Sequence, residues 1–61
     1  MNINSLVGLF TEDAKAQCKE EGLAVRVTNI DNESLFVTEE IDPMRINLTI
    51  NQGVVTDVTL G

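Results

Sequence analysis

The sequence contains no histidine and a single cysteine, Cys18. One cysteine cannot form a disulfide within the chain, and without histidine no Cys/His cluster exists to hold a structural zinc ion. We therefore expect no intrachain disulfide, no metal and no cofactor. The missing histidine also removes the usual base that generates a reactive thiolate, so Cys18 is predicted to be a buried packing residue rather than a nucleophile.

Long apolar runs are also missing. No stretch approaches the roughly 20 apolar residues that cross a bilayer as a helix. Residues 1–5 lack a basic region followed by an apolar run, so the start of the chain does not read as a signal peptide. We expect a cytoplasmic protein that makes no membrane contact.

Basic residues are scarce, with four Lys and Arg against ten Asp and Glu and a formal net charge of −6 at pH 7. The imbalance is concentrated in residues 31–42, which hold five carboxylates and no basic residue. Such a surface repels nucleic acid and anionic membranes. It would suit a basic partner or an enzyme whose site selects acidic side chains, and it would also serve solubility alone.

A chain of 61 residues is long enough for one domain and lies near the lower limit for folding without disulfides or metals. We therefore expect residues 1–61 to form a single domain. Paired carboxylates such as Glu39 and Glu40 support acid–base chemistry only in a concave pocket that excludes water. Because so short a chain has little room for such a pocket, we do not expect an enzyme.

One helix is predicted, from Thr11 to about Glu21. Thr11 has the character of an N-cap, and Glu12 and Asp13 follow it at the positive end of the helix dipole. Gly22 is suited to end the helix in the left-handed conformation. Residues 5–10 before it read as an extended segment or a turn.

Three strands are predicted near residues 23–28, 45–51 and 54–60 from the alternation of apolar and polar side chains. The connection 51–53 ends in glycine, which predicts an antiparallel hairpin with a left-handed bulge residue. The long excursion after residue 28 allows the first two strands to be parallel, and residues 35–37 within it read as a short strand or an anchor. The fold class is then α+β, one helix packed on a small three-stranded mixed sheet. The predicted core is Leu6, Phe10, Ala14, Cys18, Val25, Val27, Ile46, Leu48, Ile50, Val58 and Leu60.

Several short motifs resemble the potato inhibitor I family, which includes the chymotrypsin inhibitors of seeds and leech eglin. They are Leu6-Val7-Gly8, the helix start Thr11-Glu12-Asp13-Ala14-Lys15, Val25-Arg26-Val27, Val37-Thr38-Glu39-Glu40, Arg45 and the final Gly61. Residues 42–48 are closer still to bacterial and fungal inhibitors that share the fold, in which a proline precedes the arginine by two positions and an asparagine follows it by two. The resemblance covers almost the whole chain. It implies a binding loop between two parallel strands that enters a serine protease active site as a substrate would.

The resemblance also implies roles for individual residues. The scissile bond falls between Glu39 and Glu40, and the reactive loop that contacts the protease is Thr38, Glu39, Glu40 and Ile41. The residues that support the loop from below are Pro43, Arg45 and Asn47.

Some positions depart from the family. Asn47 stands where plant members have a second supporting arginine, and residues 27–38 form a slightly longer segment than theirs. Glu39 occupies the specificity position, where the well-known inhibitors mostly carry apolar residues. Bacterial members often end in Cys-Gly and are exported, whereas this chain ends Leu60-Gly61.

The sequence is compatible with two functions. In the first, the protein inhibits a serine protease, a glutamate-selective one being the best match to Glu39. In the second, the same fold serves as a small intracellular binding protein, such as a viral one, that sequesters a host protein or binds a small signalling ligand, as a monomer or a small homo-oligomer. Arg45 also reads as an ordinary strand-edge arginine that pairs with Asp42 or Glu40, and the two glutamates as a solvated loop.

Overall fold

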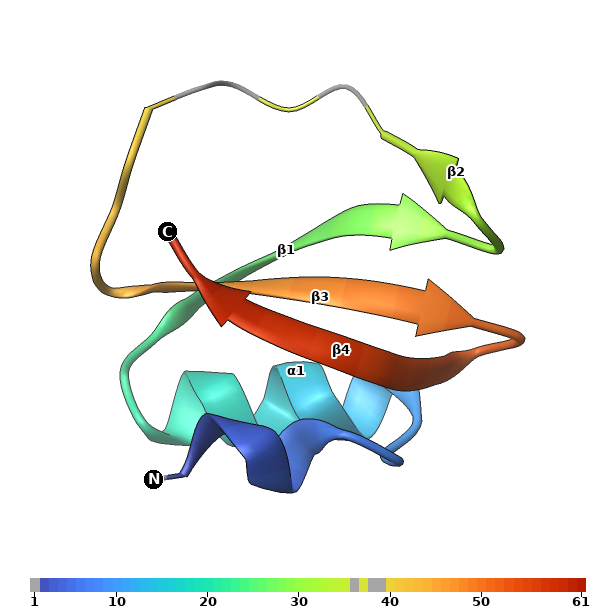
Figure 1. Ribbon diagram of the computed structural model, residues 1–61. Helices are drawn as coiled ribbons and strands as arrows, with labels where there is room; N and C mark the ends of the chain where they lie inside the picture. Colours follow the sequence, from blue (N-terminus) through green and yellow to red (C-terminus); the bar gives the residue numbers. More distant parts are fainter. Residues whose placement is uncertain (1, 36, 38–39) are drawn as a thin grey trace.

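The computed structural model describes residues 2–35, 37 and 40–61. In chain order its elements are the 3-10 helix η1 (Ile3–Leu6), the helix α1 (Thr11–Glu20) and the strands β1 (Ala24–Ile30), β2 (Glu33–Ser34), β3 (Arg45–Asn51) and β4 (Val54–Leu60). The strand order is β2-β1-β3-β4 (Figure 1). The β1–β3 pair is parallel, and β2 and β4 pair antiparallel with their neighbours. The α+β class, the mixed sheet and the parallel pair are confirmed, but the prediction of three strands is wrong, because the described residues form four.

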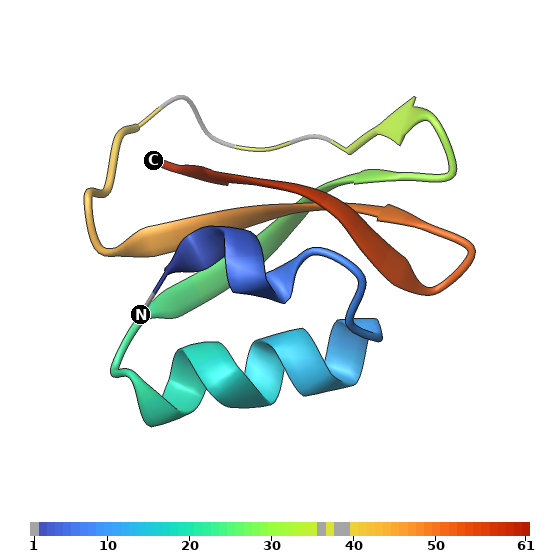
Figure 2. The ribbon, with the colours of Figure 1, turned by 60° about the horizontal axis from the view of Figure 1, so that its bottom comes forward.

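The helices and the connection from β2 to β3 lie on opposite sides of the molecule. Both η1 and α1 lie on one side of the sheet in two views, while the described residues of the connection lie past the other side (Figures 1 and 2). None of the helices within the described residues has the length and apolarity needed to cross a membrane.

The helix α1 begins at Thr11 and not after it. The N-cap position is Phe10, which makes no side-chain capping bond, so the prediction of Thr11 as N-cap is wrong. The hydroxyl and the main-chain N–H of Thr11 instead both donate to the carbonyl oxygen of Gly53, at 3.2 and 3.0 Å. The predicted end is confirmed, since Gly22 has a φ of 72°. There the N–H of Leu23 donates to the carbonyl oxygen of Cys18 at 2.9 Å.

The segment before α1 covers the outer edge of β4 where that strand begins. Gly8 N–H donates to the carbonyl oxygen of Val55 at 2.8 Å, and Val55 N–H donates to that of Leu9 at 2.9 Å. Because side chains alternate along an extended segment, Leu9 packs against the core while Phe10 points outward and is 67% exposed. The prediction of Phe10 as a core residue is therefore wrong.

The core lies between the helices and the sheet. Its buried members are Leu6, Ala14, Cys18, Ile46, Leu48, Ile50, Val55 and Val58, and Val25 and Val27 are partly buried against them. Leu60 was predicted to be buried but is 56% exposed, because it is the last residue of an edge strand. Val55, which the alternation did not select, is buried because the pairing of β3 with β4 shifts after Val55, so that Thr56 is an extra residue. This bulge places Val55 and Val58, three positions apart, on the same face.

Two tight turns meet at one end of the sheet. Asn51 pairs directly with Val54, so the β3–β4 loop has two residues, Gln52 and Gly53, both with positive φ. This is the geometry of a type I′ turn, and the predicted three-residue bulged hairpin is wrong. Asp31 and Asn32, also with positive φ, join β1 to β2 in the same way. The Asp31 carboxylate accepts a hydrogen bond from the N–H of Gln52 at 2.8 Å, which ties the two turns together.

Residues 35–37 read from the sequence as a short strand or as an anchor for the loop. The structure forms β2 at Glu33–Ser34, just before that apolar segment. Leu35 then donates its N–H to the carbonyl oxygen of Thr28 at 2.8 Å. This bond anchors the start of the connection to β1, as the sequence allowed. Phe36, in the middle of the segment, is outside the described residues.

Candidate functional site

The predicted reactive loop is described only in part. Thr38 and Glu39 lie outside the described residues. Of the two residues joined by the predicted scissile bond, only Glu40 is therefore described. Glu40 and Ile41 are described, as are the three supporting positions. Ile41 is 84% exposed, the most exposed of the large apolar side chains described.

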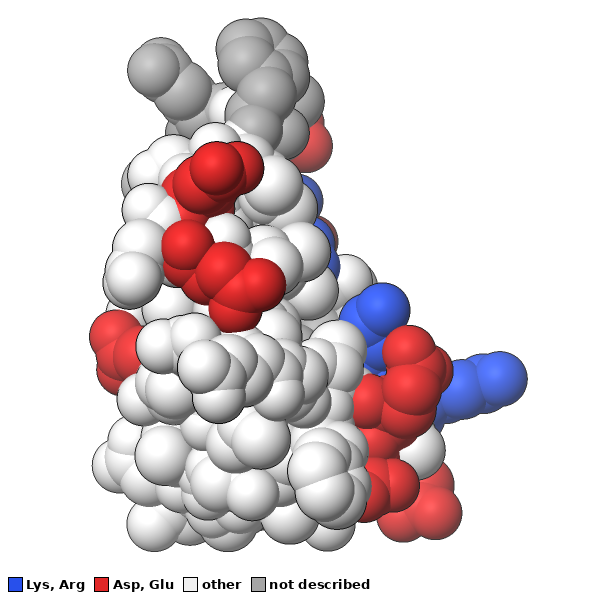
Figure 3. Space-filling view, turned by 90° about the vertical axis from the view of Figure 1, so that its right-hand side faces the viewer, with Lys and Arg blue, Asp and Glu red and all other residues white. Residues whose placement is uncertain are grey.

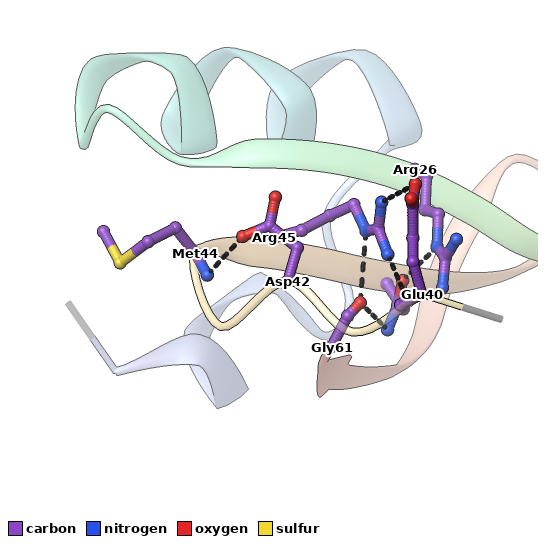
Figure 4. Close-up of polar contacts among 7 residues, drawn as sticks. Arg26, Glu40, Asp42, Met44, Arg45 and Gly61 are labelled. Atoms are coloured by element: carbon purple, nitrogen blue, oxygen red, sulfur yellow. Dashed lines mark hydrogen bonds and ion pairs between the residues drawn. The ribbon is translucent and has the colours of Figure 1, made fainter. Parts of the chain in front are cut away.

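Arg45, the first residue of β3, connects this loop to the sheet (Figure 4). Its Nη2 donates to the main-chain oxygen of Glu40 at 2.9 Å, and its Nε donates to the main-chain oxygen of Gly61 at 3.1 Å. The side chain is only 13% exposed. Hydrogen bonds from a charged donor are stronger than neutral ones. The guanidinium therefore fixes the main chain on the carboxyl side of the predicted scissile bond.

An ion pair adds little to this contact. Arg45 Nη1 lies 3.7 Å from Oε1 of Glu40, whose side chain is 71% exposed. An exposed pair of this kind contributes under about 1 kcal/mol, because water screens it. The pairing of Arg45 with Glu40, read from the sequence as the ordinary alternative, is thus present, but the two main-chain contacts carry more of the interaction.

Pro43 belongs to a turn that reverses the chain just before β3. The Asp42 carboxylate accepts from the N–H of Met44 at 2.9 Å, and Arg45 N–H donates to the carbonyl oxygen of Asp42 at 3.1 Å. Proline at the second position of a turn matches its fixed φ, and aspartate at the first position satisfies the turn's own N–H groups. The turn sets the direction from which the loop reaches Arg45.

Asn47 is connected to the loop indirectly, through Gly61 and Arg45. Its Nδ2 donates to the main-chain oxygen of Gly61 at 3.3 Å and to Oγ1 of Thr59 at 3.4 Å. Its Oδ1 accepts from Nε of Arg26 at 2.6 Å. Among the described residues the Asn47 amide contacts β1, β4 and Gly61. Asn47 therefore acts on the oxygen that Arg45 also binds.

Sequence reasoning missed Arg26 and Gly61 as members of this site. A signal was present, because Arg26 lies between Val25 and Val27, just as Asn47 lies between two buried residues of β3. Parallel pairing puts Arg26 and Asn47 in register, on the face of the sheet opposite the core. The alternation gives the face of each residue, whereas the alignment of the two strands comes only from the structure.

The electrostatic surface is acidic but uneven. On the face at the right of Figure 1, acidic side chains gather in separate groups with an uncharged surface between them (Figure 3). Asp31 and Glu33 are exposed at the β1–β2 turn. In residues 2–35, 37 and 40–61 no three side chains are grouped in a way that could hold a metal ion, and no pocket is found in this part of the chain.

Cys18 is fully buried under the sheet, as predicted, and burial raises the pKa of its thiol. We expect a disulfide reagent to label the native protein at least about 100-fold more slowly than the urea-unfolded chain, because burial limits both the access of the reagent to the sulfur and the fraction of thiol that is ionised.

The pH dependence of stability is a second test. A thiol pKa that is higher in the folded than in the unfolded state contributes stability that is lost as pH rises past the unfolded value of about 8.5. Urea unfolding at pH 7 and 9.5 should therefore show lower stability at pH 9.5, with Cys18→Ala as the control that removes this difference. Equal labelling of native and unfolded protein would contradict the prediction.

Comparison of this chain with family models, curated proteins and solved structures found no match. The resemblance to the potato inhibitor I family thus depends on the motifs read from the sequence. The contacts of Arg45 are an independent observation about the same loop.

Proposed function

We propose that the protein is a serine protease inhibitor with the potato inhibitor I fold, which presents residues 38–41 to the protease. The observation that carries the proposal is the contact of Arg45 with the main-chain oxygen of Glu40, made while the same guanidinium is held by Gly61. A partly buried guanidinium below an exposed acidic segment is the arrangement expected of a support for that loop.

The physical basis is preorganisation. Ordering a flexible backbone costs about 1–2 kcal/mol per residue, and a loop already held in shape does not lose that entropy when it binds. Fixing the main chain at Glu40 has a second effect. If the protease cuts the preceding bond, the new amino group stays close to the acyl-enzyme, and this proximity favours re-formation of the bond over release.

Specificity depends on Glu39. A carboxylate that enters an apolar pocket loses its hydration without gaining a partner. The proposed targets are therefore proteases with a basic or polar specificity pocket, which cleave after glutamate. The acidic residues around the loop, Glu40 and Asp42, suit the same kind of enzyme surface.

The test compares the unmodified protein with Glu39→Leu on a panel of serine proteases that includes a glutamate-selective, a trypsin-like, a chymotrypsin-like and a subtilisin-like enzyme. We expect the unmodified chain to inhibit the glutamate-selective enzyme best. Glu39→Leu should shift inhibition toward the chymotrypsin-like and subtilisin-like enzymes by about 100-fold or more, because the desolvation cost of a carboxylate is removed.

Inhibition constants and mass spectrometry of the chain after long incubation provide the readout. Glu33→Leu, at an exposed glutamate on β2, is the matched control and should leave the specificity unchanged. A folded Glu39→Leu protein that neither inhibits nor is cut between residues 39 and 40 would rule out the proposed function.

A further inference from the structure

Arg26 lies on β1, well before the loop in sequence, yet it belongs to the same polar network. Its Nε donates to Oδ1 of Asn47 at 2.6 Å, and the two residues are direct partners in the parallel β1–β3 register. Both are partly buried. Figure 4 shows Arg26 and Arg45, from two different strands, on the face of the sheet where Glu40 lies.

The orientation of the Asn47 amide depends on Arg26. An amide has an acceptor end and a donor end, so an Oδ1 that faces the guanidinium leaves Nδ2 to face Gly61 and Thr59. In the reversed orientation, Oδ1 would face the main-chain oxygen of Gly61 and repel it. Arg26 therefore selects the orientation in which Asn47 donates to Gly61.

Gly61 is the point where the two halves of the network meet. Its main-chain oxygen accepts from Nε of Arg45 and from Nδ2 of Asn47, and its N–H donates to the carbonyl oxygen of Arg45. This oxygen thus accepts from two side chains at once. Without the Asn47 contact, Gly61 would be held by Arg45 alone, and the position of the guanidinium that also binds Glu40 would be less well fixed.

We propose that Arg26 is a positioning residue for the reactive loop: it orients Asn47, which with Arg45 fixes Gly61 and thereby the guanidinium that holds Glu40. This inference rests on the proposed function for its effect on inhibition, but not for its effect on the structure. The cation beside position 47 is thus Arg26 of the neighbouring strand β1, and Asn47 connects it to Gly61.

The experiment uses four variants in the protein–protease pair that gives the tightest inhibition: Arg26→Ala, Arg26→Lys, Asn47→Arg and the double variant Arg26→Ala/Asn47→Arg. Arg26→Ala should raise the rate of cleavage between residues 39 and 40 about tenfold and weaken inhibition by a similar factor, as expected for the loss of one charge-assisted bond. The double variant should recover most of both, because its new arginine on β3 reaches Gly61 or the loop without Asn47. Arg26→Lys should recover less, because lysine lacks the planar donor fork.

Lys15→Ala removes a positive charge from α1 and is the charge-matched control, with cleavage and inhibition unchanged. Urea unfolding of each variant separates a local effect from a global one. The proposal is overturned if Arg26→Ala lowers stability but leaves both the cleavage rate and the inhibition constant unchanged. It is also overturned if the double variant recovers neither slow cleavage nor tight inhibition, because Arg26 is then only structural.

A second measurement does not need any protease. Proton exchange of the Arg45 Nε–H and of the main-chain N–H of Gly61, each of which donates a hydrogen bond in this network, can be followed by NMR. Both should exchange about tenfold faster in Arg26→Ala than in the unmodified protein. Unchanged exchange at both would overturn the proposal even where inhibition falls. Faster exchange in a protein that inhibits no protease would support the role of Arg26 and reject the proposed function.

Discussion

Replacing Leu48 with alanine is expected to lower the free energy of unfolding by about 3 kcal/mol, the largest effect on stability of any change considered for this protein. Leu48 is fully buried at the centre of β3, where Val27 is its partner on one side and Val58 on the other. Alanine would remove the apolar contact and leave a cavity that a sheet fixed on both sides cannot close. A domain of this size has a total stability of only about 3–9 kcal/mol, so the loss is a large share of it.

Leu60→Ala is the matched control, because the same atoms are deleted from a side chain that is 56% exposed. Its expected cost is under about 1 kcal/mol, since less buried area is lost and no cavity forms. Urea unfolding followed by circular dichroism measures both. Losses of similar size for Leu48→Ala and Leu60→Ala would mean that the core is not centred on β3.

Replacing Arg45 with alanine is expected to affect inhibition more than any other change outside the scissile pair. The main-chain oxygens of Glu40 and Gly61 would both lose a charged donor. Each such bond contributes about 1.5–3 kcal/mol, part of which appears as lost stability and part as lost order in the loop. In the Glu39→Leu protein, inhibition should weaken by about 100-fold, while cleavage between residues 39 and 40 accelerates, so that the inhibitor becomes a substrate.

Arg45→Lys is informative beside it. Lysine keeps the positive charge but offers a single ammonium group, which cannot hold Glu40 and Gly61 from two sides. Its inhibition constant should fall between those of the arginine and alanine proteins. An Arg45→Ala protein that inhibits as tightly and is cut as slowly as its parent would show that the loop owes its shape to other contacts.

Much of the sheet follows from local patterns. Alternation along Arg45–Asn51 predicts β3 because one face of that strand is buried throughout, as Ile46, Leu48 and Ile50 show. The same rule fails on β4, where the bulge at Thr56 changes the face in the middle of the strand. It also fails at Phe10, whose backbone bridge with Val54 turns an apolar side chain outward. Bulges and bridges are decided by the neighbouring strand, which a local pattern does not contain.

The site was predictable to a similar extent. Pro43, Arg45 and Asn47 were predicted as supporting residues from a resemblance between short motifs, and the contacts of Arg45 fit the supporting role expected of it. The link from Arg26 through Asn47 to Gly61 was not predicted. Each of its bonds joins residues that are far apart in sequence, and each depends on a strand register that is known only from the folded chain.

The parallel pairing of β1 with β3 has a consequence for the chain between Leu35 and Arg45. Leu35 lies beside Thr28, and Arg45 pairs with Ala24 on the other side of β1. Four residues along a strand and two strand spacings put these points about 16 Å apart, whereas the ten peptide units between them can extend to roughly 33 Å. The link therefore has about twice the contour length that topology requires. Because doubling a loop costs only about 0.6 kcal/mol in closure entropy, foreign peptides inserted before Glu40 should be accepted, which makes this small domain a scaffold for displaying them.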